Sequence, residues 1–137
     1  MTLQPLLAAS WVVQVHMVAL VLALFVGTWQ FFLSRKGAAA HRALGAVFIA
    51  LMVIMALVSL FIRERSPNSP FFGLSVLHWY VPLVLGLCGM AAYGGMTRRL
   101  ALHRFAVIAL YFGSLIFTGV VQTFLVPGIT HDIFFTR

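Results

Sequence analysis

The sequence predicts an all-α integral membrane protein, an antiparallel four-helix bundle. Of its 137 residues, 63% are hydrophobic and only 8% are charged, whereas an ordinary soluble domain carries about a quarter charged residues. The apolar residues fall into four runs, each near the ~20 residues that cross ~30 Å of hydrocarbon. Lipid offers the backbone no hydrogen-bond partner, so continuous apolar runs predict helices, whereas a β-barrel would show alternating polarity.

The composition excludes several other classes of protein. Disordered chains are poor in apolar residues, and a soluble domain of this size would leave too much apolar surface exposed. Cys88 is the only cysteine, which excludes a disulfide scaffold. The net charge of +7 is interpreted as basic loops on one side of a membrane, and we expect no nucleic-acid partner. No basic segment precedes the first apolar run, so we expect no cleaved signal peptide.

The four predicted spans form one domain over residues 1–137. Because short connections make successive helices antiparallel neighbours, the spans should pack as a single compact bundle. The connection at 63–70 has the Pro, Asn and Ser residues of a true turn. The predicted spans are 10–33, 41–62, 72–95 and 100–126.

The basic residues predict the orientation of the bundle. Cytoplasmic loops of membrane proteins carry an excess of Lys and Arg. The first and third connections, with the helix starts after them, hold six basic residues, and the other side holds three. We therefore expect both termini outside the cytoplasm. The six are Arg35, Lys36, Arg42, Arg98, Arg99 and Arg104, and the three are Arg63, Arg65 and Arg137.

Four of the five histidines lie within or at the ends of the spans: His16, His41, His78 and His103. Ionisable residues inside membrane spans are rare and usually face the bundle interior. His16 precedes His78 by 62 positions, and His41 precedes His103 by the same interval. Two further pairs keep this offset, namely Arg42 with Arg104 and Gly27 with Gly89. We interpret the offset as a tandem repeat of a two-helix hairpin, over 10–62 and 72–126.

The histidines should form two levels, each with one residue from each of two alternate helices. His16 and His78 lie near the outer ends of their helices, and His41 and His103 lie at inner starts, roughly 20 Å away. Alternate helices of a bundle lie diagonally, roughly 13 Å apart for neighbours at ~8–10 Å. This gap suits a haem with one imidazole on each face of its iron. We therefore predict two b haems. They should be bound non-covalently, because the chain has no Cys-x-x-Cys-His motif.

Glycines and arginines surround the expected haem ligands. Gly27, Gly45 and Gly89 would leave room beside the macrocycles, although glycines in membrane helices often serve close packing instead. Arg42 and Arg104 follow the inner ligands and could pair with haem propionates, or act only as topology signals. His131 and Asp132 are either a surface pair or a proton or quinone contact.

The histidine pattern resembles the four-helix core of dihaem b-type cytochromes, of the ascorbate-reducible and the bacterial four-helix types. In those families four histidines from alternate helices hold two haems stacked across the membrane. The resemblance implies that His16 and His78 bind the outer haem, and that His41 and His103 bind the inner one.

A second resemblance covers nearly the whole chain. Residues 15–16, 27–31, 41–48, 77–78 and 103–104 look like a widespread family of small bacterial membrane proteins, the domain of unknown function number 2306. This implies a multi-pass protein of the bacterial inner membrane and supplies no activity. The chain departs from the family pattern at Ala46, where a basic residue commonly follows the glycine.

These residues predict transmembrane electron transfer, between a quinone or other small redox partner and an acceptor across the membrane. Such a protein could be an oxidoreductase of the cytochrome b type. Two alternatives are a haem-free accessory subunit of a larger membrane complex or homo-oligomer, and a proton-coupled transporter. A proton relay would need acidic partners within the spans, and the spans contain none. Pro82 also has no counterpart in the first repeat, because Leu20 stands there.

Overall fold

The computed structural model describes residues 4–62 and 76–124, and every regular element in this part of the chain is a helix. This confirms the prediction of an all-helical protein. The element η1 is a short 3-10 turn, and η2 is a π-helical segment. The elements are α1 (Gln4–Leu7), α2 (Trp11–Phe32), α3 (Ala39–Ser59), η1 (Val76–Trp79), α4 (Tyr80–Met96), α5 (Leu100–Ile108), η2 (Ala109–Phe117) and α6 (Thr118–Phe124).

Three of the helical stretches are long and apolar enough to cross a membrane: Trp11–Phe32, Ala39–Ser59 and Leu100–Val121. They match the first, second and fourth predicted spans, although α3 begins two residues earlier and ends three residues earlier than predicted. The predicted ends at 72–75 and 125–126 lie outside the described residues.

The third predicted span is a shorter apolar helix, α4, of 17 residues. The 3-10 turn η1 leads directly into it. Pro82 lies in the first turn of α4, where its missing N–H costs no helical hydrogen bond. The proline therefore explains why the α-helix begins near this position, a boundary that hydropathy alone does not reveal.

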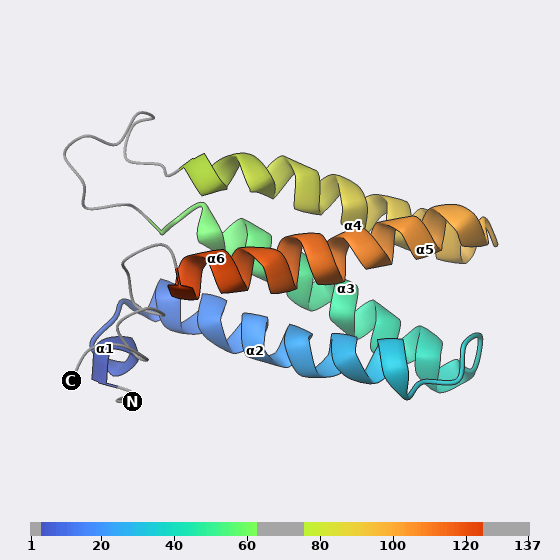
Figure 1. The fold of residues 1–137 in the computed structure, drawn as a ribbon, viewed down its shortest axis with the longest axis horizontal. Helices are drawn as coiled ribbons and strands as arrows, with labels where there is room; N and C mark the ends of the chain where they lie inside the picture. Colours follow the sequence, from blue (N-terminus) through green and yellow to red (C-terminus); the bar gives the residue numbers. More distant parts are fainter. Residues whose placement is uncertain (1–3, 63–75, 125–137) are drawn as a thin grey trace.

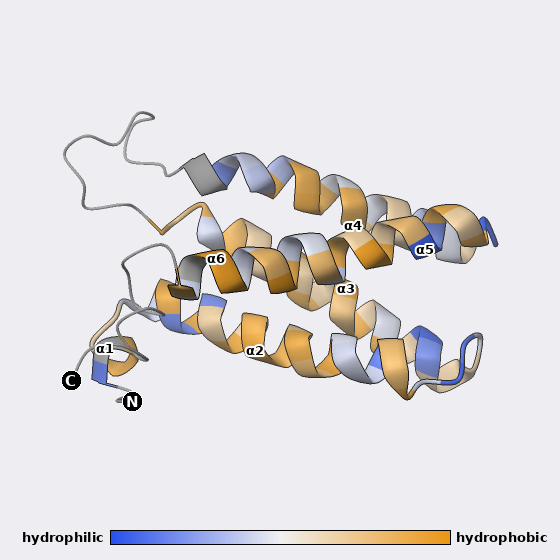
Figure 2. Ribbon diagram, in the orientation of Figure 1, coloured by the Kyte–Doolittle hydropathy of each residue, from blue (hydrophilic) through white to orange (hydrophobic). Residues whose placement is uncertain are grey.

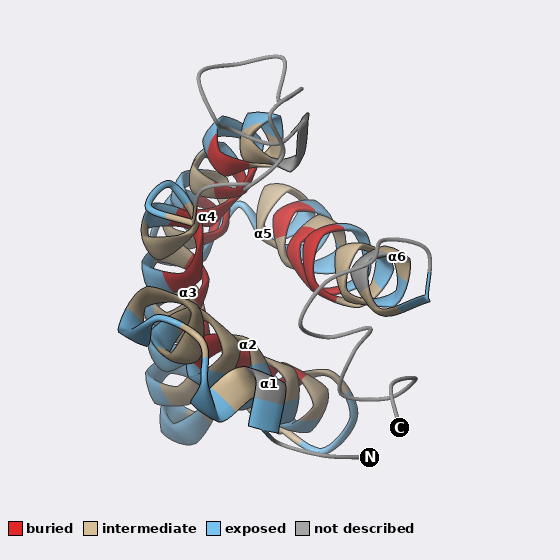
Figure 3. Cartoon of the chain, turned by 90° about the vertical axis from the view of Figure 1, so that its left-hand side faces the viewer, coloured by how far each residue is buried: buried red, intermediate tan, exposed pale blue. Residues whose placement is uncertain are grey.

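The helices run back and forth along one long axis (Figure 1). Helix α3 packs against both α2 and α4, α5 packs against α4, and η2 contacts both α2 and α4. In Figure 3 the helices α2, α3 and α4 form a curved row, and the last helical stretch lies across from it. We call the end where α2 and α4 finish and α3 and α5 begin the basic end; the other is the opposite end. The basic end carries Arg35, Lys36, Arg42, Arg98, Arg99 and Arg104.

Large apolar side chains cover the outside of the helices. Phe25 is 70% exposed and Phe105 is 61% exposed, and Figure 2 shows hydrophobic residues along the middle of every long helix. Such a surface would be unstable in water but is the normal exterior of a helix in lipid. The chain therefore folds with hydrocarbon as its solvent, as its composition predicts.

The buried face of α2 consists mainly of small residues. Ala19, Ala23 and Gly27 are buried and lie four residues apart, so they follow one another along one face. Membrane helices gain little from the hydrophobic effect when they associate, and small residues let their backbones approach closely. Phe48 and Met52 are among the large buried residues of α3.

Gly27 is a point of close contact between α2 and the last helical stretch. A Cβ added there would lie 2.7 Å from Cδ2 of Tyr111 and 2.9 Å from Cε2 of Phe48. The Thr28 hydroxyl donates to the carbonyl of Leu24 at 2.7 Å, so the Tyr111 hydroxyl donates to Thr28 Oγ1, at 2.6 Å. This bond ties the π-helical segment to α2.

We predict that Gly27→Ala lowers the free energy of unfolding by about 1–3 kcal/mol, because the new methyl group overlaps two buried rings. Gly89→Ala is the matched control, since a Cβ there meets nothing within 4 Å. It should be neutral or stabilise the helix by about 0.5–1 kcal/mol. Thermal unfolding in detergent, followed by helical circular dichroism, measures both. Equal effects of the two substitutions would contradict the close packing at Gly27.

Candidate functional site

His16, His41 and His103 each lie in register with buried residues of their own helix, and His78, in the 3-10 turn η1, lies in register with a buried residue of α4. His16 precedes the buried Ala19 by three residues, and His103 precedes the buried Ala106 by three. His41 precedes the buried Phe48 by seven, and His78 precedes the buried Val81 by three. These intervals return to one helix face, so all four side chains belong to buried faces, and all four are half-buried.

His41 stands in the first turn of α3 at the basic end. Its Nδ1 atom is 2.9 Å from the Ser34 hydroxyl, in the connection from α2. Gln30 Nε2 donates to the backbone carbonyl of His41 at 2.7 Å. His103 lies in the first turn of α5, so the two histidines of the predicted inner pair are both at the basic end.

His103 is held against α4 by two glycines that are not among the predicted site residues. Its Nδ1–H donates to the carbonyl of Ala91 at 2.8 Å. A Cβ at Gly94 would lie 2.7 Å from the backbone nitrogen of His103, and one at Gly95 would lie 3.3 Å from its Nδ1. The Gly94-Gly95 pair therefore lets α5 begin in contact with α4. The two adjacent glycines near the end of α4 are the feature of the sequence that could have indicated this close contact.

His16 and His78 both turn toward α3 at the opposite end. His16 Nδ1–H donates to the carbonyl of Met55 at 3.1 Å. His78 Nε2 contacts the carbonyls of Ser59 at 2.9 Å and Ile62 at 3.1 Å. Met55 and Ser59 are one turn apart, about 6 Å along the helix axis. The last carbonyls of a helix lack i+4 partners. The Ser59 carbonyl accepts from the N–H of Ile62 at 3.0 Å as well as from His78, so His78 adds to the capping of α3.

The histidines at the basic end are better arranged to bind haem iron than the histidines at the opposite end. A metal-binding histidine commonly donates its other ring N–H to a carbonyl. His16 and His103 do so through Nδ1, His41 contacts Ser34 through Nδ1, and the Nε2 atoms of these three have no hydrogen-bond partner among the described residues. His78 instead uses Nε2 on α3. Ligation by His78 Nε2 would require its ring to leave the end of α3.

A family model described as a predicted membrane protein, DUF2306, matches residues 13–137. The chain belongs to the DUF2306 family. No curated protein and no solved structure matches it.

The three glycines predicted beside haem have different surroundings in this DUF2306 chain. Gly27 faces the rings of Tyr111 and Phe48. A Cβ at Gly45 would lie 3.3 Å from Gln30 Nε2, whereas Gly89 is exposed and meets nothing within 4 Å. The positions that correspond in the predicted repeat, Gly27 and Gly89, are thus used differently.

The predicted propionate partners are on the surface of the basic end. Arg42 and Arg104 are exposed, and Arg42 donates to the carbonyl of Gly37 at 2.8 Å. Lys36 Nζ donates to the carbonyls of Gln30 and Phe31 at the end of α2. The predicted sites at His131 and Asp132 lie outside the described residues.

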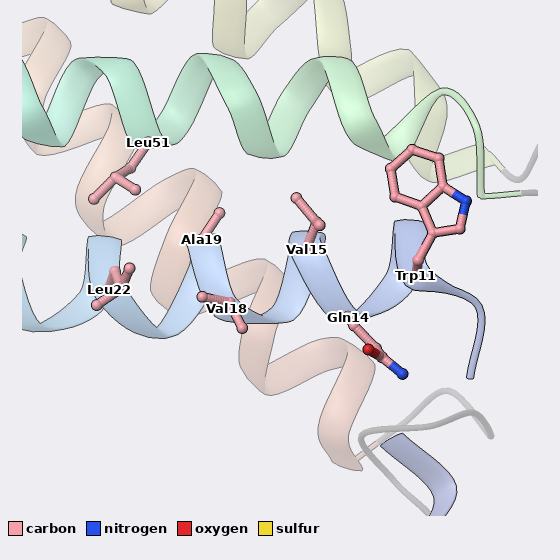
Figure 4. A pocket seen from close by; sticks show the side chains of 7 residues that line it. All are labelled: Trp11, Gln14, Val15, Val18, Ala19, Leu22 and Leu51. Carbon is pink, nitrogen blue, oxygen red and sulfur yellow. The ribbon is translucent and has the colours of Figure 1, made fainter. Parts of the chain in front are cut away.

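A shallow apolar groove of about 370 Å³ runs along the outside of α2 toward the opposite end (Figure 4). Gln14 borders it, and its Nε2 donates to carbonyls around the end of α1, including Ala9 at 3.1 Å. None of the four histidines lines this groove. Its residues are Trp11, Gln14, Val15, Val18, Ala19, Leu22 and Leu51.

We predict that His78→Leu lowers the free energy of unfolding by about 1 kcal/mol, because the carbonyl of Ile62 loses this donor and the carbonyl of Ser59 keeps only the N–H of Ile62. His78→Gln keeps an N–H donor and should restore part of the loss. Thermal unfolding of preparations shown to be haem-free by their absorption spectrum measures this effect. If both variants melt like the original chain, the cap does not contribute to stability.

Proposed function

We propose that this DUF2306 protein is a transmembrane electron carrier that holds two bis-histidine b haems. His41 and His103 would hold one haem at the basic end, and His16 and His78 would hold the other at the opposite end. The observation that carries the proposal is the placement of the four histidines on buried helix faces, two at each end.

The surroundings of His41 and His103 give this pair the stronger support. Both histidines lie in the first turns of their helices at the basic end, and each has its Nδ1 in contact with Ser34 or with the carbonyl of Ala91. Those contacts would fix the ring orientation and leave Nε2 toward a metal. Ligation also suits the membrane interior, because it keeps each imidazole neutral in a medium of low dielectric.

Binding at the opposite end would carry an additional cost. His16 already has Nδ1 on the carbonyl of Met55. His78 would have to give up the carbonyls of Ser59 and Ile62 before its Nε2 could bind iron. We therefore expect the basic-end pair to bind haem more tightly than the opposite-end pair.

We also propose a topology for the chain. The six cations would place the basic end in the cytoplasm of a bacterium, with both termini across the inner membrane. The shared 62-residue offset of the histidines supports two antiparallel hairpins related as parallel repeats. The π-helical segment η2 has no counterpart in α3. The two proposed repeats would therefore differ in the structure of their second helix.

When bound, haem would supply reversible one-electron transfer, and two bis-histidine sites would leave no iron position open for oxygen. The chain would supply the ligands, their orientation and an apolar shell that excludes water. An electron that crosses the whole membrane works with or against ~2.3 kcal/mol per 100 mV. The reductant is expected to be a quinol or another small redox molecule.

The first test is the visible spectrum and haem content of protein purified in detergent from haem-sufficient cells. We expect two haems per chain, one after His41→Ala with His103→Ala, and one after His16→Ala with His78→Ala. His131→Ala is the matched control and should retain both. A haem-free original chain from such cells would overturn the proposal.

A second variant keeps the test informative if the alanine variants fail to fold. His41→Met preserves a metal ligand of similar size, and methionine ligation raises the reduction potential of haem iron. We predict that one of the two haems titrates at a higher potential in this variant while the other is unchanged. Spectroelectrochemical titration measures the shift, and unchanged potentials for both haems would exclude His41 as a ligand.

A further inference from the structure

Arg104 is a cation on the exposed side of a membrane-spanning helix. Leu100, Arg104 and Ile108 lie four residues apart and therefore follow one another along one face of α5. All three are exposed, Leu100 by 56% and Ile108 by 50%, whereas Ala106, about 200° further round the helix, is fully buried. The span begins at Leu100. Arg104 thus lies within an apolar surface, about one turn from the start of the span.

A guanidinium at this position needs an anion at the membrane surface. Arginine stays protonated in proteins, and a charge in hydrocarbon is costly, so long basic side chains near a helix end extend to the level of the lipid headgroups. In the described part of the chain, the side chain of Arg104 has no hydrogen-bond or ion-pair partner. The whole sequence holds two acidic residues against nine Lys and Arg. Even if both acidic residues lay at the basic end, its six cations would leave that end positive, so counter-charge must come from outside the chain.

The turn between α4 and α5 adds two further cations. Arg98 and Arg99 directly precede the span, and both are exposed; Figure 2 shows this turn as a hydrophilic segment at the end of the bundle. The guanidinium carbon of Arg99 lies over the ring of Tyr93, 5.4 Å from its centre. This attraction holds the guanidinium without an acceptor, so its N–H groups stay available for an oxyanion.

The other turn of the basic end uses its cations differently. Lys36 donates to the last carbonyls of α2, and Arg42 donates to the carbonyl of Gly37 at 2.8 Å. Two of the three cations at the α2–α3 turn therefore bind the backbone of that turn. In the part of the chain that the structure describes, none of the three arginines at the α4–α5 turn does so. The α4–α5 turn is thus the better site for an external anion.

Large apolar side chains flank the arginines of the α4–α5 turn. Met96, just before the turn, is 82% exposed, and Phe105, next to Arg104, is 61% exposed. A soluble anion would gain nothing from this apolar surface. A phospholipid presents a phosphate and acyl chains together, and arginine binds phosphate oxygens with paired N–H donors. Basic sites at the ends of membrane helices bind anionic headgroups in this way.

We propose that the α4–α5 turn binds an anionic phospholipid. Its phosphate accepts hydrogen bonds from Arg98, Arg99 and Arg104, and an acyl chain lies along the exposed face that carries Leu100 and Ile108. This role goes beyond the orientation of the chain, because orientation depends on the number of cations, whereas binding depends on their place at this turn. It does not rest on the proposed haem groups.

Lipid titration of the full chain in detergent tests the site. Phosphatidylglycerol, which is anionic, is compared with phosphatidylcholine of the same acyl chains and with glycerol 3-phosphate, which has no acyl chain. Native mass spectrometry counts the bound molecules. We expect one phosphatidylglycerol to bind saturably, about tenfold or more tightly than either competitor, because choline places a cation beside the arginines. Equal binding of phosphatidylcholine or of glycerol 3-phosphate would overturn the inference.

A matched pair of substitutions locates the binding. Arg104→Gln should weaken phosphatidylglycerol binding about tenfold, the equivalent of one charged hydrogen bond. Arg42→Gln is the control, because Arg42 is exposed and corresponds to Arg104 by the 62-residue offset. It should change the Kd by less than about twofold, since it removes only a screened attraction. Equal weakening by both substitutions would mean that the whole end attracts anions without a site, and would overturn the inference.

Arg98→Gly separates lipid binding from folding. Arg98 has a φ of 58°, which residues other than glycine rarely adopt, and glycine adopts it without strain. The variant should therefore melt at a higher temperature than the original chain and yet bind phosphatidylglycerol less tightly. This arm still decides the question if Arg104→Gln does not fold. Unweakened binding by Arg98→Gly would contradict the assigned site.

The haem spectrum separates this site from the propionate pairing predicted for Arg104. A haem-free preparation should bind phosphatidylglycerol as the original chain does, and Arg104→Gln should leave the haem content unchanged. Lipid binding by a chain that never contains haem would support the site and overturn only the proposed electron carrier. Loss of haem after Arg104→Gln, with unchanged lipid binding, would assign Arg104 to a propionate and overturn the lipid site.

Discussion

The absence of water around the helices is the constraint on which the rest of the structure depends. A polar group in hydrocarbon must find its partner within the protein, and three of the histidines find theirs at neighbouring helices. His16 joins α2 to α3, His78 joins the start of α4 to the end of α3, and His103 joins α5 to α4. In lipid, where apolar contact between helices competes with equally apolar acyl chains, such bonds help to fix which helices pack together.

Small residues make these polar contacts possible. Gly27 admits the ring of Tyr111, whose hydroxyl then reaches Thr28, and Gly94 admits the backbone at His103. Close approach and hydrogen bonding are therefore coupled at both places. A larger residue at either glycine would separate the helices and also break the polar contact beyond it. A substitution at either glycine should therefore lower the free energy of unfolding by more than the loss of local packing alone would.

Hydropathy and periodicity predicted much of the fold but few of the contacts. The first span was predicted to within one residue at each end, because α2 is mostly apolar and both ends are marked by polar residues. The 3-10 start of α4, the π-helical segment η2 and the ring partners of the histidines depend on tertiary contact, so no local pattern reveals them. The sequence predictions above assign no role to Gln30. Its spacing from Ala23 and Gly27, seven and three residues, was the signal that it belongs to the buried face.

The low dielectric of the membrane also makes metal binding by the histidines differ in cost between the two ends. At the basic end, the contacts of His41 and His103 use Nδ1, so ring orientation and metal binding through Nε2 are compatible. At the opposite end, His78 Nε2 holds the carbonyls of Ser59 and Ile62. Withdrawal of that ring would remove a donor from both carbonyls, and only the Ser59 carbonyl would keep another, the N–H of Ile62; an unsatisfied carbonyl costs free energy. Haem binding through His78 would therefore be coupled to a rearrangement of the last turn of α3, whereas binding at the basic end would not.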